Sequence, residues 1–233
     1  MNIKYITLED WEREWKTKFE AVYNGIGSDN YTTSDDFVMR SVSGITPTLF
    51  KNSDWELAAL PDKYWTDLTR GPEHYEGYYS PGEEYVPFIW RDELVHVFEA
   101  FAKLGLREMV LTEAHCTPIE YLNPDKIAFL IPATRAGYDE LWKEYKPVVN
   151  TAFDPTGRWG MESMHECDTI LGGDAEFMHT FYECSGGKQA VIDREYTYYA
   201  SDEPDGCLEC AIDILFGYLG WDAPTVPPKT RIA

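Results

Sequence analysis

Apolar residues recur at helical spacing near the N-terminus, and this pattern predicts an amphipathic helix. Thr7, with Asp10 three residues later, resembles a capping box at its start, and Asn24-Gly25 is a typical end. The predicted apolar face consists of Leu8, Trp11, Trp15, Phe19 and Val22. We expect this face to pack against the core.

The same spacing predicts further helices along the chain. One covers residues 94–104 and stops at Gly105, and another covers residues 138–145 and is closed by Pro147. Residues 54–68 are predicted to form an aromatic-rich helix that is interrupted near the proline at position 61.

Runs rich in β-branched and aromatic residues predict strands between these helices. Residues 37–42 form one predicted strand. Residues 109–111 and 127–131 form two more, with a turn near Asn123-Pro124 between them. Residues 150–171 show no clean period, and we expect a turn there with either a strand or a short helix.

The C-terminal third of the chain predicts a β-hairpin followed by a helix. Residues 175–184 and 189–200 are rich in aromatic and β-branched residues, and they flank the turn-like sequence Ser185-Gly186-Gly187-Lys188. Ser201 or Asp202 can then cap a helix. The apolar face of that helix consists of Leu208, Ala211, Ile212, Leu215 and Leu219. We expect hairpin and helix to form a core unit.

Helices mixed with hairpin-like strand pairs favour an α+β fold, in which several amphipathic helices pack on an antiparallel sheet built from hairpins. We predict a single globular domain over residues 1–222, and a subdomain boundary, if there is one, near residues 147–160. Residues 223–233 are proline-rich and are predicted to form an extended tail.

The composition of the chain limits the kinds of partner that it can bind. The chain is 44% hydrophobic and 15% aromatic, enough to bury a core, yet it has 41 acidic against 20 basic residues and a net charge of −21. That charge repels phosphate backbones and anionic lipids, so we expect no direct binding to nucleic acid or membrane. The N-terminus shows no signal-peptide pattern, and an odd number of cysteines, five, suits reduced thiols. We therefore expect a cytoplasmic protein.

Two short motifs are candidate sites of chemistry. Cys207-x-x-Cys210 suits half of a zinc site, which Cys184 or the pair His165-x-Cys167 would have to complete, and half-buried thiols are the competing interpretation. His115-Cys116-Thr117 resembles one half of a two-histidine phosphodiesterase signature, but the second triplet is absent. Serine-hydrolase, nucleotide-loop and EF-hand motifs are also absent, so we assign no catalytic residue, metal or cofactor.

Acidic side chains interleaved with aromatic ones favour a protein-binding surface. Asp205, Glu209 and Asp213 stack like charges along one line of the predicted last helix, which weakens a helix by a few tenths of a kcal/mol per pair. Such rows suit docking on a basic partner, with aromatic anchors. The predicted partner-binding residues are Tyr75, Tyr78, Tyr79, Glu83, Glu84, Tyr85, Asp202, Glu203, Asp205, Glu209 and Asp213.

In its general character the chain is similar to bacterial immunity proteins and phage-encoded inhibitors of nucleases and other defence enzymes. The resemblance lies in composition alone, so it transfers no functional residues. It implies an inhibitor that docks on the basic cleft of a nuclease or nucleic-acid-guided defence complex, with carboxylates in place of phosphates. The alternatives are a small metal-dependent hydrolase or phosphodiesterase that uses His115, and an adaptor domain that binds a protein without inhibiting it.

Overall fold

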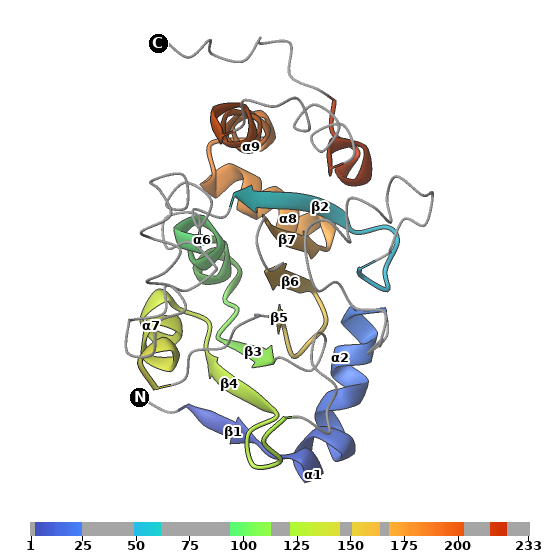
Figure 1. The fold of residues 1–233 in the computed structure, drawn as a ribbon, viewed down its shortest axis with the longest axis vertical. Coiled ribbons are helices and arrows are strands. Elements are labelled where there is room, and N and C mark those ends of the chain that lie inside the picture. Colours follow the sequence, from blue (N-terminus) through green and yellow to red (C-terminus); the bar gives the residue numbers. More distant parts are fainter. Residues whose placement is uncertain are drawn as a thin grey trace.

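The fold is built on one antiparallel sheet. The computed structural model describes residues 3–24, 49–61, 94–112, 122–144, 151–163, 168–202 and 215–222. The strands are β1 (Lys4–Ile6), β2 (Glu56–Pro61), β3 (Glu108–Thr112), β4 (Ala128–Pro132), β5 (Thr151–Phe153), β6 (Trp159–Ser163) and β7 (Asp168–Gly173). They lie in the order β1-β4-β3-β5-β6-β7-β2, and every neighbouring pair is antiparallel (Figure 1). The predicted α+β class, with an antiparallel sheet and packed helices, is confirmed.

Helices cover the sheet. They are α1 (Leu8–Asp10), the π-helical segment η1 (Trp11–Trp15), α2 (Lys16–Val22), α6 (Leu94–Leu104), α7 (Arg135–Glu144), α8 (Ala175–Cys184) and α9 (Lys188–Asp202). Residues 215–219 are also helical. Ring contacts show that α2 and α6 cover opposite faces of the sheet. Phe19 of α2 contacts Phe153 on one face, and Phe101 of α6 contacts Trp159 on the other. The sheet is therefore the middle layer of the core.

The N-terminal helix forms as its spacing predicts. The side chain of Thr7 accepts a hydrogen bond from the backbone N–H of Asp10 at 3.2 Å, which satisfies one of the free amides at the helix start. Trp11, Trp15 and Phe19 are buried on the predicted face. The middle of this helix widens to a π-helix, which the sequence pattern does not reveal.

Several other predictions are confirmed. Helices α6 and α7 lie where the spacing places them, and α6 ends at Gly105, whose φ of 68° is the left-handed conformation that glycine adopts readily. Strands β3 and β4 pair around a turn at Asn123, whose carbonyl accepts from the backbone N–H of Lys126 at 2.8 Å. Within residues 150–171, for which the spacing predicts no single element, the structure has β5, β6 and most of β7.

The predicted C-terminal hairpin is wrong, because both of its arms are helices, α8 and α9. Gly186 and Gly187 have φ values of 86° and 104°, and they end α8 instead of turning a hairpin. The backbone N–H of Gly187 reaches back to the carbonyl of Tyr182 at 2.7 Å, the pattern of a Schellman motif. Ser201 and Asp202 are the last two residues of α9. The start of the helix predicted to follow them lies outside the described residues, and Leu215 and Leu219 of its predicted apolar face lie in the helical residues 215–219.

The predicted helix over residues 54–68 is also wrong where the structure describes it. Residues 56–61 form strand β2, which pairs with β7 over its full length. The apolar run Leu57-Ala58-Ala59-Leu60 supplies buried side chains at Ala58, Ala59 and Leu60. A short apolar run is compatible with either a buried strand or a helix, and pairing with β7 decides between them. Residues 62–68 and the predicted strand 37–42 lie outside the described residues.

Tyr23 fixes the end of α2 to the sheet. Its hydroxyl lies 2.7 Å from the carbonyl oxygen of Ala152 and accepts from the backbone N–H of Met161 at 2.9 Å. Ala152 and Met161 are register partners on β5 and β6, so this hydroxyl links two central strands. The close approach needs glycine at position 160, where a Cβ atom would lie 3.0 Å from the same hydroxyl and 2.6 Å from Val22.

A short clamp follows Tyr23. The backbone N–H of Asn24 donates to the carbonyl of Leu49 at 3.0 Å, and that of Lys51 donates to the carbonyl of Val22 at 2.8 Å. The side-chain amide of Asn24 adds a bond to the carbonyl of Phe50 at 2.9 Å. These bonds tie residues 22–24 to residues 49–51, so both ends of the intervening chain segment are held together.

Candidate functional site

Most of the predicted partner-binding residues lie outside the described part of the structure. The exception is Asp202, the last residue of α9. His115, His165, Cys207 and Cys210 lie outside it as well, and Cys184 is a partly buried free thiol. Among the described residues, no three histidine, cysteine or carboxylate side chains come together as metal ligands.

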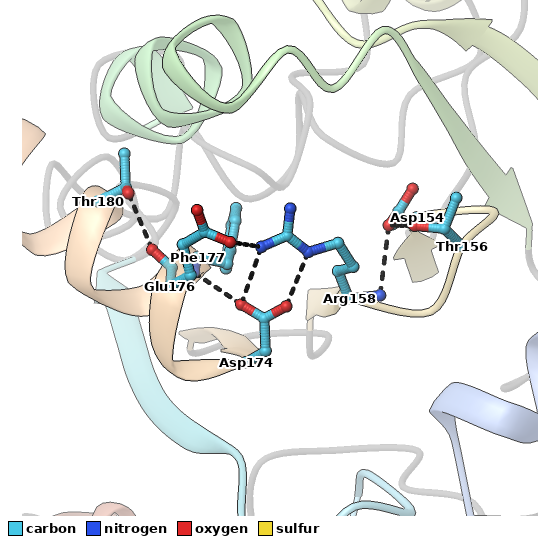
Figure 2. Close-up of polar contacts among 7 residues, drawn as sticks. All are labelled: Asp154, Thr156, Arg158, Asp174, Glu176, Phe177 and Thr180. Carbon is cyan, nitrogen blue, oxygen red and sulfur yellow. Dashed lines mark hydrogen bonds and ion pairs between the residues drawn. The ribbon is translucent and has the colours of Figure 1, made fainter.

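Among the described residues, an ionic cluster of three side chains forms around Arg158 and joins the β5–β6 turn to the start of α8 (Figure 2). Arg158 lies in the turn between β5 and β6, and Asp174 lies directly before α8. The guanidinium donates to both carboxylate oxygens of Asp174, at 2.7 and 3.3 Å, and to Glu176 at 2.7 Å. Such a two-pronged contact is the strong form of an arginine–carboxylate pair.

Asp174 has a second role as the cap of α8. Its carboxylate accepts from the backbone N–H of Phe177 at 2.7 Å. Partial burial disfavours the ionised form, but the hydrogen bonds from Arg158 and Phe177 outweigh it, so the pKa of Asp174 lies below its ordinary value. The hydrogen bond to Asp174 in turn raises the pKa of Arg158.

The turn that carries Arg158 is itself held by a buried carboxylate. Asp154 is 3% exposed, and its side chain accepts from the hydroxyl of Thr156 and from the backbone N–H of Arg158. Its carbonyl accepts from the N–H of Gly157, whose φ of 80° suits glycine. The guanidinium is therefore presented to α8 by a preformed turn.

The role of this cluster is structural. Two carboxylates of the same chain balance the charge of the guanidinium and accept from its Nε and Nη2, which makes it a poor site for an anionic ligand. The cluster holds the β5–β6 turn against the start of α8. Sequence reasoning missed it, although Asp174 before an apolar run is a recognisable cap signal. The partner of Asp174 lies 16 residues away, and no local pattern identifies it.

Replacing Asp174 by alanine is expected to lower the free energy of unfolding by about 1–2 kcal/mol, since the cap bond and the arginine pair are both lost. Urea unfolding followed by circular dichroism measures this loss. Glu183→Ala, at an exposed carboxylate near the end of the same helix, is the matched control and is expected to change little. Equal losses in the two variants would contradict the assigned role.

The effect of Asp174 should also depend on pH. Because its pKa is lowered by folding, its ionised form stabilises the protein above the ordinary carboxylate range. That contribution disappears as the pH falls through the lowered pKa of the folded state. The stability difference between the wild type and Asp174→Asn should therefore shrink between about pH 5 and pH 2. A difference that persists at the acid end would exclude the charge as its source.

A second polar feature lies within the sheet. Thr112, Thr151 and Glu162 are register partners on β3, β5 and β6, so their side chains share one face. All three are at most 3% exposed, and the hydroxyl of Thr112 donates to the carbonyl of Ile127 at 2.8 Å. This polar row holds one carboxylate and, among described residues, no histidine or cysteine ligand set. We assign it no chemistry.

Acidic charge is spread over the described residues. They include 23 acidic and 13 basic residues. Six of the basic side chains are held in ion pairs with carboxylates, namely Arg13, Lys16, Lys18, Arg135, Arg158 and Lys188. The acids lie on α2, α7, α8 and α9, among other places, so the excess is a general property of this part of the molecule and not one local cluster.

None of the described helices combines the length and the apolar character needed to cross a bilayer. Comparison of the chain with known protein families, with curated proteins and with solved structures gives no match.

Proposed function

We propose that this chain is an acidic inhibitor that docks on the basic cleft of a nuclease or a nucleic-acid-guided defence complex. Its carboxylates would occupy the positions of nucleic-acid phosphates, and tyrosines between them would anchor the contact. Immunity proteins and phage anti-defence proteins are the inhibitors to which we compare it. The cytoplasm is the compartment in which we expect it to meet its partner.

The observation that carries this proposal is the net charge of −21 in a chain that also has a packed core. The described residues alone contribute −10 of this charge. Several of their basic side chains are paired with carboxylates of the same molecule. Because acidic residues outnumber basic ones, other carboxylates, such as Glu20 and Glu108, are exposed to solvent. These exposed charges would attract a basic protein surface, which speeds association, and would repel acidic partners.

The two acidic and aromatic segments are the surfaces proposed for the contact. One contains Glu83 and Glu84 among the tyrosines of residues 75–85, and the other contains Asp205 and Glu209. Reversing all four charges to lysine is expected to slow association with the partner at least about 10-fold at low salt. The difference should shrink as salt rises and screens the charges.

The partner is first captured on the immobilised chain from lysate of the host or of a competing cell, and it is eluted with increasing salt. Association rates with that purified partner are then compared for the wild type and two variants. The control reverses Glu9, Glu20, Glu108 and Asp125, four exposed acids elsewhere, so both variants have equal net charge. Equal slowing in both variants would contradict the assignment of the two segments.

Inhibition of the partner is measured separately from binding. The captured partner should lose nuclease or nucleic-acid-binding activity when an equal amount of the wild-type chain is added. A displacement assay with a fluorescent DNA oligonucleotide measures competition for the cleft directly. Binding without loss of activity or DNA displacement would indicate the adaptor alternative.

A further inference from the structure

The side-chain amide of Asn24 is part of the clamp between residues 22–24 and 49–51. Asn24 is exposed, and its Nδ2 donates to the carbonyl oxygen of Phe50 at 2.9 Å. The next residue is Gly25, and no other asparagine of the chain precedes a glycine. Glycine has no Cβ atom, so its backbone nitrogen is the least hindered for attack on the preceding asparagine side chain. A chemically reactive pair therefore stands at a contact that holds two segments together.

Two other described asparagines use their side chains in the opposite sense. The Oδ1 atom of Asn52 accepts from the backbone N–H of Asp54 at 3.0 Å. That of Asn123 accepts from the backbone N–H of Asp125 at 3.0 Å. An ionised aspartate also accepts hydrogen bonds, but it cannot donate one. Exchange of the amide for a carboxylate would therefore preserve the bonds at Asn52 and Asn123 and remove the bond at Asn24.

We propose that Asn24 is a site of spontaneous deamidation, and that this modification removes the side-chain bond of the clamp. The deprotonated backbone nitrogen of Gly25 attacks Cγ of Asn24, the Cγ–Nδ2 bond breaks, and ammonia leaves. Water then opens the five-membered succinimide, which gives aspartate or isoaspartate at position 24. In both products the Nδ2 donor is gone, and the new carboxylate is repelled by the carbonyl oxygen of Phe50.

Deamidation is irreversible, so the clamp changes with the age of the chain. The backbone bonds from Asn24 to Leu49 and from Lys51 to Val22 remain, because the reaction leaves their donors and acceptors in place. The side-chain bond to Phe50 does not form again. An aged molecule therefore holds residues 22–24 against residues 49–51 through the backbone bonds alone.

The first measurement follows the modification itself. Folded wild-type protein is aged at mildly alkaline pH and digested, and its peptides are analysed by mass spectrometry. The peptide with Asn24 should gain the mass difference between an amide and a carboxylic acid, ahead of the peptide with Asn52. Asn123 cannot react in this way, because Pro124 has no N–H. Gly25→Val should lose most of the conversion at Asn24. A wild-type chain in which Asn24 stays intact, or reacts no faster than in Gly25→Val, would overturn the proposal.

The second measurement determines the effect of the modification on the fold. Asn24→Asp imitates one product and should lower Tm by about 2–4 °C, the shift expected for the net loss of one hydrogen bond. Asn52→Asp adds the same charge at an exposed residue and keeps its acceptor, so its Tm should change by less than about 1 °C. Equal shifts in the two variants would overturn the role given to Nδ2.

Two substitutes cover variants that do not fold. If Asn24→Asp fails to fold, the Tm of aged wild type is compared with that of aged Gly25→Val, and the same fall is expected. If Gly25→Val fails to fold, Asn24→Gln replaces it in both measurements, because glutamine would have to close a larger ring. Aged wild type with an unchanged Tm after conversion at Asn24 would overturn the proposal.

Discussion

Replacing Trp159 by alanine is expected to lower the free energy of unfolding by about 3–5 kcal/mol. The indole is fully buried on β6, and its ring stacks on Phe101 at 4.6 Å and on Phe177 at 5.8 Å between centroids. Those partners belong to α6 and α8, so the indole joins the sheet to two helices. Alanine leaves a large cavity that these rings cannot fill without moving.

The loss is measured by urea unfolding followed by circular dichroism, because removing a tryptophan also changes the fluorescence signal. It corresponds to a fall in Tm of about 6–20 °C for a domain of this size. His179→Ala, at an exposed position on α8, is the control and should change the unfolding free energy by less than about 0.5 kcal/mol. A loss below about 1 kcal/mol for Trp159→Ala would contradict this packing.

Tyr23→Phe is expected to lower the free energy of unfolding by about 2–3 kcal/mol, a large effect for the loss of one oxygen atom. The ring remains, so its contacts with Phe19 and Phe50 persist. The buried N–H of Met161 then loses its partner in the hydroxyl, and the carbonyl of Ala152 does too. A buried backbone group without a partner costs about 1–3 kcal/mol.

Amide hydrogen exchange identifies where this loss arises. The exchange rate of the Met161 amide should rise in Tyr23→Phe by more than that of amides in β3 and β4. Tyr5→Phe, at a ring that is 38% exposed on β1, is the matched control and should leave both the stability and the Met161 amide nearly unchanged. Uniform acceleration across the sheet would mean that the hydroxyl contributes only to global stability.

The sequence predicts elements well where one kind of side-chain period is clear. The N-terminal helix has large apolar residues at helical spacing and a capping threonine, and both signals agree with the structure. Strands β3 and β4 are short apolar runs on either side of a turn at Asn123, which favours antiparallel pairing. Local chemistry and tertiary packing point the same way at these places.

Prediction fails where residue preference and spacing disagree. Aromatic residues favour strands, and this preference predicts a hairpin between residues 175 and 200. The spacing of Phe177, Met178, Phe181 and Tyr182 is helical, and packing on the sheet selects the helix. The same paired glycine signal serves a hairpin turn or a helix end, and only the surrounding structure distinguishes them.

The acidic character of the molecule follows from the sequence, but the position of its ionic contacts does not. Net charge is additive along the chain. The contact between Arg158 and Asp174 depends instead on how the β5–β6 turn meets α8, which is fixed only when the sheet is complete. Charge count therefore supports a class of partner, and geometry is needed to separate a carboxylate that faces a partner from one that holds the fold together.

The clamp between residues 22–24 and 49–51 has a consequence for how this protein can vary. The backbone bonds at Asn24 and Lys51 fix both ends of the intervening stretch to the core. These two bonds are made by backbone groups, so they do not depend on which side chains stand at positions 24 and 51, but each needs an N–H donor, which proline lacks. Asn24→Pro or Lys51→Pro is therefore expected to open the clamp, while Lys51→Ala leaves it closed. Relatives of this chain should accordingly avoid proline at both positions.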